Sequence, residues 1–175
     1  TAIKSAAVTT TVPGQPVDWN AGGIKLVGSP ESTQKQYRII GGDYDFLKVY
    51  GLKLIAGRNF SKDFSTDGDA VIFNRKGIEH LGFNKPEEAL GKRIDFWGRQ
   101  YTVIGITENF HQQSLREAYE PLIIRLIPDA RGYLSARFTG AQANDAIKIV
   151  KSNWDKFFPG NTFEFFFLDD HFNKQ

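Results

Sequence analysis

The clearest secondary-structure pattern of the chain is in GKRIDFWGRQYTVIGITENFHQQ, residues 91–113. This stretch holds two β-rich runs, 93–97 and 100–106, which the dipeptide Gly98-Arg99 separates. A two-residue loop with glycine first is typical of a type II′ turn, so the stretch predicts a β-hairpin. After residue 106 the sequence turns polar, which indicates a strand that leaves the sheet.

The alternation within the two runs predicts that the hairpin is buried on one side. A register that pairs Trp97 with Gln100 gathers the apolar side chains on one face. These residues are Ile94, Phe96, Tyr101 and Val103. The opposite face carries Arg93, Asp95 and Thr102. We expect the apolar face to pack on a core.

Strand-like and helical runs alternate outward from the hairpin, which predicts an α+β fold with a mixed sheet. The expected strands are 1–12, 24–27, 36–40, 52–55, 70–73, 121–127, 132–138 and 162–168. The expected short helices are 43–51, 74–82, 86–91 and 114–118.

The longest expected helix, residues 139–158, has an apolar stripe at helical spacing. The stripe consists of Ala143, Ile147, Val150, Trp154, Phe157 and Phe158. We expect this helix to be a scaffold that packs on strands 121–127 and 162–168. Trp154→Ala should then cost about 3–5 kcal/mol.

Composition and charge exclude several classes of protein. A chain of 175 residues with 41% hydrophobic and 24% charged residues is an ordinary globular domain, or one with an insertion. A net charge of +2, with both signs interspersed, gives no footprint for nucleic acid. The lack of cysteine excludes disulfides and thiolate sites. No apolar run is long enough to span a bilayer.

Both ends of the sequence suggest a segment of a larger protein. The chain begins with Thr1 and contains no methionine, which indicates excision or processing. A helix expected from Asp169 meets no stop signal before Gln175, so we expect the natural chain to continue as helix.

The polar clusters predict no catalytic, cofactor-binding or metal-ligating residue. His111 lies near Glu108 and Ser114, but no paired-histidine spacing accompanies it. Asp169-Asp170-His171 are adjacent on a helix, so their side chains diverge. Gly41-Gly42 lacks the remaining glycines of a phosphate-binding loop. Loop, capping and turn roles are the simpler interpretation.

The aromatic residues leave two alternatives open. Trp19, Tyr37, Trp97 and Phe110 could form a platform for a sugar or a protein partner. They could equally be core residues, because the chain has 15 Phe, six Tyr and three Trp to bury.

Short motifs recur in a fixed order from Asp45 onward, and the order is more specific than any single motif. They are DFL at 45–47, GLKL at 51–54, AGRNFS at 56–61, AVIFN at 70–74, LGK at 90–92, YTVIGI at 101–106, NFH at 109–111, SL at 114–115, EPL at 120–122 and FEFFFLD at 163–169. This series resembles the extracytoplasmic periplasmic core domain of MacB-like and FtsX-like ABC transporter permeases, especially those of Bacteroidetes. Residues 106–108, ITE, depart from the usual Val-Val-Lys or Val-Val-Asp run, where no chemistry is assigned.

The resemblance implies a fold of two parts and a place in the cell. Residues 1–55 and 107–175 would form a porter-like lobe with helices on one face of its sheet, and residues 56–106 an inserted, smaller sabre-like α/β lobe. The domain would face the periplasm from the inner membrane, between two transmembrane helices. Thr1 and Gln175 should therefore lie close together.

The resemblance also implies function and partners. The domain would have no active site, cofactor or metal, and would couple ATP hydrolysis by a separate cytoplasmic ATPase to export or to action on periplasmic proteins. Expected partners are a second permease subunit, that ATPase through the membrane part, and an adaptor or cargo, with no nucleic acid. The alternatives are a free-standing periplasmic module that binds a sugar or peptide, and a hydrolase.

A surface at the tip of the hairpin is the candidate for partner recognition. It carries Trp97, Arg99, Asp95 and Gln100. A large aromatic beside charges at a turn is a composition enriched at protein interfaces. We expect Trp97 to be replaceable without loss of stability.

Overall fold

The computed structural model describes residues 2–30, 35–112 and 117–173, with side chains up to residue 170. Its strands are β1 (Ile3–Thr9), β2 (Asn20–Gly22), β3 (Lys25–Leu26), β4 (Gln36–Gly42), β5 (Leu54–Gly57), β6 (Ala70–Asn74), β7 (Arg93–Phe96), β8 (Arg99–Thr107), β9 (Leu122–Leu126) and β10 (Tyr133–Phe138). Its α-helices are α1 (Phe46–Tyr50), α2 (Arg75–Leu81), α3 (Pro86–Ala89), α4 (Ala143–Phe157) and α5 (Leu168–Asn173). Two 3-10 turns are η1 (Ser65–Asp69) and η2 (Gly140–Gln142).

One mixed sheet joins all the described strands, in the order β10-β1-β4-β9-β6-β8-β7-β3, with β2 on β4 and β5 on β8. The pairs β4–β9 and β6–β8 are parallel, and the others are antiparallel. The α+β fold with a mixed sheet is therefore confirmed. The predicted boundaries after residues 55 and 106 fall within β5 and β8, and the division into two lobes stays a prediction.

Helices cover both faces of the central strands, and each face has its own apolar core. Along β6, Val71 and Phe73 enter the core beneath α2 and α3, whereas Ala70 and Ile72 enter the core beneath α1. This alternation follows from the two-residue period of a strand. The central strands are consequently buried on both sides.

The predicted hairpin forms, but its turn differs from the prediction. The loop is Trp97-Gly98, so Phe96 pairs with Arg99 and Ile94 with Tyr101. Both loop residues have positive φ, 54° and 84°, as a type I′ turn requires rather than type II′. The register thus moves by two residues, which leaves every side chain on its predicted face.

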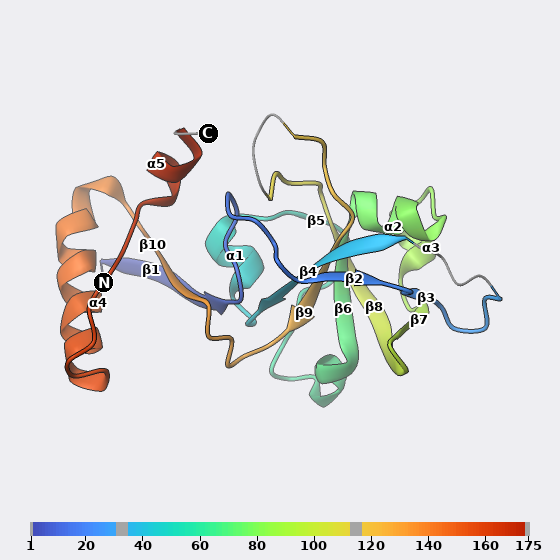
Figure 1. Cartoon of the computed structure of the whole chain (residues 1–175), viewed down its shortest axis with the longest axis horizontal. Coiled ribbons are helices and arrows are strands. Elements are labelled where there is room, and N and C mark those ends of the chain that lie inside the picture. Colours follow the sequence, from blue (N-terminus) through green and yellow to red (C-terminus); the bar gives the residue numbers. More distant parts are fainter. Residues whose placement is uncertain (1, 31–34, 113–116, 174–175) are drawn as a thin grey trace.

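The first and last segments form a projection that we call the arm: β1, β10, α4, residues 158–167 and α5. β1 pairs with β10 along its length but meets the main sheet only where Thr9 pairs with Gly42. Figure 1 shows β1 and β10 reaching away from the central strands toward α4, at one end of the long axis. We call the remainder of the described chain the body.

The arm corrects two predictions. Residues 162–167 form no strand, and Phe165 is 54% exposed rather than buried on both sides. The long helix begins at Ala143 after a 3-10 turn, and it has one fully buried side chain among those described, Ala146. Trp154 is half-buried and packs on Phe158 and Phe163, and the cost of its removal stays a prediction.

Thr1 and Gln175, which we expect to lie close together, are both outside the described residues. The same holds for most of the helix expected at 114–118. The neighbouring elements are described: the start of β1 and helix α5 lie at the same end of the molecule (Figure 1). In the parts of the chain that the structure describes, no helix is long and apolar enough to cross a bilayer.

The carboxamide of Asn74 locks three elements of the body together. Its Oδ1 accepts hydrogen bonds from the backbone N–H groups of Gly77 and Leu122, at 2.7 and 3.0 Å. Its Nδ2 donates to the carbonyl of Glu120 at 2.8 Å. The side chain therefore caps α2 and also fixes β9 beside β6. Asn109 Oδ1 accepts from Lys76 N, 2.8 Å away, and secures the same helix start.

The motif AGRNFS owes its form to a clasp between Arg58 and Asp67. Two guanidinium nitrogens of Arg58 donate to the Asp67 carboxylate at 2.7 and 2.8 Å, and the backbone N–H of Ser61 donates to the same carboxylate at 2.9 Å. Asp67 is 1% exposed, whereas Arg58 lies over the ring of Phe64 at the surface. The hydrogen bonds from Arg58 hold the pKa of Asp67 below its usual range, against the opposing effect of burial.

We predict that Asn74→Ala lowers the free energy of unfolding by about 3 kcal/mol. The change removes a helix cap, the side-chain partner of the buried N–H of Leu122 and a hydrogen bond to the part-buried carbonyl of Glu120. Urea denaturation at pH 7 measures the loss, and Asn84→Ala, at an exposed asparagine, is the control. A loss below about 1 kcal/mol would show that the lock is replaceable.

We predict that Asp67→Asn lowers stability at pH 7 by about 1–3 kcal/mol, because a charge-assisted hydrogen-bond network is lost. The folded-state pKa of Asp67 is depressed. Its contribution is therefore present above the unfolded-state pKa of about 3.9 and disappears as the pH falls through the lower folded value.

The difference between wild type and Asp67→Asn should accordingly shrink as the pH falls below about 4. Unfolding by urea at a series of pH values measures it. Asp63→Asn, at an exposed position of the same loop, should show no such pH-dependent difference. A constant difference at all pH values would mean that Asp67 contributes no ionic stabilisation.

Candidate partner-binding surface

The four predicted residues do come together at the hairpin tip, and the chain immobilises three of them. Asp95 Oδ1 accepts from the backbone N–H of Gly98 at 2.9 Å, which braces the turn. Arg99 reaches Asp69 with two nitrogens, at 2.6 and 2.8 Å. Asp69 raises the pKa of Arg99, so the guanidinium stays charged. Gln100 pairs with Asp95 across the strands and is exposed.

Trp97 is the prominent residue of this surface, with 65% of its area exposed. Its Nε1 donates to the carbonyl of Gly22 at 2.9 Å, and its ring meets Phe96 nearly edge-on, with centroids 5.1 Å apart. A bulky side chain at φ 54° occupies backbone space that asparagine and glycine favour. The indole is thus held in one orientation at a conformational cost.

Arg125, which the sequence did not single out, contacts the aromatic rings at the base of the hairpin. The guanidinium of Arg125, in β9, lies 5.0–5.5 Å from the ring centres of Trp19, Phe96 and Tyr101. It also donates to the hydroxyl of Tyr101 at 2.7 Å. Arg125 therefore ties the hairpin to the central strands through cation–π contacts. The sequence of β9 did not predict this role of Arg125, because the rings that surround it come from distant segments of the chain.

The structure separates the four aromatics that were left open between platform and core. Tyr37 is fully buried and burial raises its pKa. Trp19 packs on the core beneath α2, and Phe110 on the core beneath α1. Trp97 alone of the four is exposed. These residues form no shared platform.

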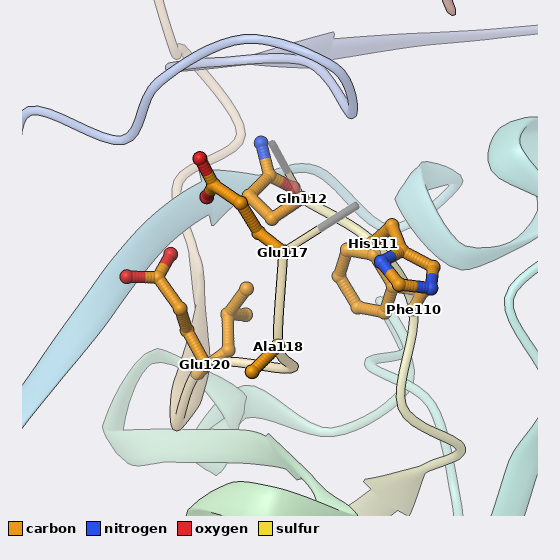
Figure 2. A pocket seen from close by; sticks show the side chains of 7 residues that line it. Phe110, His111, Gln112, Glu117, Ala118 and Glu120 are labelled. Atoms are coloured by element: carbon orange, nitrogen blue, oxygen red, sulfur yellow. The ribbon is translucent and has the colours of Figure 1, made fainter. Parts of the chain in front are cut away.

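A pocket of about 10 Å³ beside His111 has room for no more than one water molecule. Figure 2 shows the carboxylates of Glu117 and Glu120 on one side of it and the ring of His111 on the other. The ring of His111 contacts that of Tyr119 in a tilted arrangement, with centroids 4.5 Å apart. Ser114, which the sequence placed near His111, lies outside the described residues.

A wider hollow of about 350 Å³ lies between β4 and α2. Its lining consists of Asn20, Lys35, Gln36, Arg38, His80, Glu120 and Pro121. Arg38 pairs with Glu120 at 2.9 Å, and Lys35 Nζ donates to the His80 carbonyl at 2.5 Å. Burial, and the nearby charges of Lys35 and Lys76, lower the pKa of His80. The charged groups of the hollow are therefore already engaged within the chain.

Among the described residues, no group of three or more histidine, aspartate or glutamate side chains is placed to hold a metal ion. The acidic pair Asp169-Asp170 is exposed in the first turn of α5. Gly41-Gly42 ends β4, and side chains of Thr10, Phe46 and Ile127 occupy the space that a Cβ at either position would need. This dipeptide therefore serves close packing.

Residues 3–153 match the family model described as the MacB-like periplasmic core domain. No curated protein matches the sequence.

Three solved structures share the fold of the chain. The periplasmic region of MacB from Actinobacillus actinomycetemcomitans is 17% identical, with 87% of this chain and 68% of that chain covered and a TM-score of 0.56. A domain from a Porphyromonas gingivalis protein described as a permease is 15% identical, with 91% and 72% covered and a TM-score of 0.60. The extracellular domain of the noncanonic ABC-type transporter YknZ from Gram-positive bacteria is 17% identical, with 87% and 76% covered and a TM-score of 0.56.

We predict that the tip tolerates Trp97→Asn, with a change in unfolding free energy within about 1 kcal/mol. Asparagine accepts positive φ, and Asn-Gly is the preferred type I′ dipeptide, which offsets the lost indole contacts. Trp97→Val is the matched variant, because it also removes the ring but is β-branched. It should be less stable than Trp97→Asn by about 1–2 kcal/mol in urea denaturation. Equal stabilities would argue against backbone strain at this turn.

Proposed function

Because the chain belongs to the family of MacB-like periplasmic core domains, we propose that it passes the effect of cytoplasmic ATP hydrolysis to a protein outside the membrane. It is the periplasmic domain of an ABC transporter permease, with the fold of MacB and YknZ domains. The family is a transporter domain rather than a known enzyme, and we assign this chain no catalytic role.

The observation that carries the proposed contact is the exposed, immobilised Trp97. A rigid aromatic loses little conformational entropy when a partner covers it, which is why such residues dominate binding energy at interfaces. Asp95, Arg99 and Gln100 surround it with hydrogen-bonding groups. We therefore assign the tip as the surface that meets an adaptor or cargo protein.

The sheet supports transmission between the two ends of the molecule. Strands run without interruption from β3 beside the tip to β10 in the arm, and Figure 1 shows the two at opposite ends of the long axis. The cores on both faces stiffen the sheet of the body, and the arm joins that sheet at the pair Thr9–Gly42, so we propose that a displacement of the arm reaches the tip through this junction. In this proposal the arm lies on the membrane side. Residues 56–106 would act as the sabre-like part and the rest as the porter-like part.

The remaining partners follow from membership of a permease family. We propose a place in the inner membrane, a second permease subunit beside this one, and a cytoplasmic ATPase that acts through the membrane part. The alternative, a free-standing module for a sugar or peptide, draws on the hollow between β4 and α2. The internal pairing of its charges favours the permease assignment.

A photo-crosslinking amino acid at Gln100 tests the proposed contact in cells that produce the full permease. Gln100 is exposed at the tip, so its replacement leaves the fold intact. We expect a covalent adduct with a periplasmic protein, identified by mass spectrometry. Adding Trp97→Asn should lower its yield about tenfold or more.

The same crosslinker at Glu88, exposed on α3, is the control and should give no such adduct. Equal adducts at both positions, or an adduct that Trp97→Asn leaves unchanged, would refute the tip as a contact surface. The gene tests the membrane assignment separately. A transmembrane segment encoded directly after Gln175 is expected, and its absence would favour the free-standing module.

A further inference from the structure

A series of aromatic rings runs through the arm, and we call it the aromatic ladder. Neighbouring ring centroids lie 4.7–6.2 Å apart in the order Phe158, Trp154, Phe163, Phe165, Phe167, Phe138. The rings come from α4, from the segment after it and from β10. Their mutual contacts make one continuous apolar surface.

The ladder is exposed to an extent that is unusual for so many phenylalanines. Phe158, Phe165 and Phe167 are 50%, 54% and 38% exposed, and the adjacent Phe157 is 66% exposed. Among the described side chains of the arm, the fully buried hydrophobics are Ala7 and Ala146. The arm therefore places its large apolar groups outside rather than in a core. Contiguous apolar surface of this kind marks a contact with another protein or with lipid.

The polar chemistry of the ladder favours lipid. The phenylalanine side chain has no hydrogen-bonding group. The one side-chain donor in the ladder, Trp154 Nε1, already donates a hydrogen bond to the carbonyl of Asn161 at 3.2 Å. A protein partner would form about one hydrogen bond per 100–200 Å² of interface. Hydrocarbon asks for none, so the surface fits an apolar medium.

The charges beside the ladder offer no attraction to anionic headgroups. The arm contains five basic and five acidic residues, which gives a net charge of zero. Lys151 is paired with Asp155 at 2.5 Å. Lys156 lies with its Nζ 5.4 Å from the ring centre of Phe157, where its stem can cover apolar surface while the ammonium stays in water.

The position of the ladder agrees with a bilayer contact. It lies in the arm, at the end of the molecule that holds the start of β1 and helix α5 (Figure 1). The hairpin of β7 and β8 lies in the other half of the molecule (Figure 1). If the arm is the membrane-side part, as the proposed function has it, the ladder is the apolar surface nearest to lipid.

We infer that the aromatic ladder is a membrane-contact surface, which inserts its exposed rings into the interfacial layer of the bilayer beside the permease. The inference rests on the proposed function. Apolar burial drives the contact, so it requires no anionic lipid and withstands salt. The contact would anchor the arm against the membrane and leave the tip free to reach a partner.

Flotation of the 175-residue chain with extruded phosphatidylcholine vesicles tests this directly. We expect the chain to bind these vesicles. Adding 0.5 M NaCl, or replacing one quarter of the lipid with phosphatidylglycerol, should change the affinity by no more than about twofold, because the surface has no excess positive charge. Phosphatidylcholine brominated on its acyl chains should quench tryptophan fluorescence. Trp154→Phe should abolish that quenching yet still bind, since Trp19 and Trp97 lie outside the arm.

The ladder variant is Phe158→Ser with Phe165→Ser, which replaces two exposed rings. Its affinity for vesicles should be lower than that of the wild type by about tenfold or more. Trp97→Asn, which removes an exposed ring at the far end, should bind like the wild type. Phe157→Ser provides a second variant, since that ring is 66% exposed and its loss should not unfold the arm. Circular dichroism checks the fold of each variant.

Three results would overturn the inference. They are a wild-type chain that does not float with vesicles, binding that the ladder variants leave unchanged, and binding that salt abolishes. A wild-type dimer in sedimentation that becomes a monomer in the ladder variant would assign the surface to a second copy, and it would also overturn the inference. The crosslinking at Gln100 does not involve the ladder, so failure here leaves the proposed partner contact standing.

Discussion

The carboxamide of Asn74 is the interaction on which the rest of the body depends. It satisfies buried backbone groups of α2, of β9 and of the loop before β9, and buried groups of this kind are costly to leave unpaired. β6 and β9 are far apart in the sequence and pair through their backbones over three residues. The carboxamide adds a side-chain contact at one end of that pairing.

Close backbone approach imposes a second constraint beside this lock. Gly57 pairs with Gly105, and a Cβ on Gly57 would lie 2.2 Å from the carbonyl oxygen of Ile104. The glycines of the AGRNFS and YTVIGI motifs are therefore two halves of one contact. The clasp between Arg58 and Asp67 starts at the same point. The backbone N–H of Arg58 donates to the carbonyl of Ile104 in β8, and its side chain ties the end of β5 to η1.

The two ends of the molecule are built on opposite principles. At the hairpin tip, hydrogen bonds and a cation beneath the rings fix each side chain, and one exposed indole remains. In the arm, many rings are exposed and few polar bonds hold them. A rigid tip suits recognition of one partner surface, whereas an apolar face without directional bonds suits a fluid medium. The continuous sheet joins the two.

The mixed α+β fold, the family and the buried face of the hairpin could all be predicted from the amino-acid sequence. These depend on alternation and motif order, and alternation survives a register shift of two residues. The rings around Arg125 and the contacts of Asn74 with Glu120 and Leu122 became visible only in the tertiary structure, because they join segments far apart in the chain. The positive φ of Trp97 also became visible only there, since tryptophan has no preference for that backbone region. The tertiary structure also decided residues 162–167, where alternating phenylalanines predicted a strand. Alternation describes side chains, but a strand exists only where another strand is in position to accept its backbone hydrogen bonds.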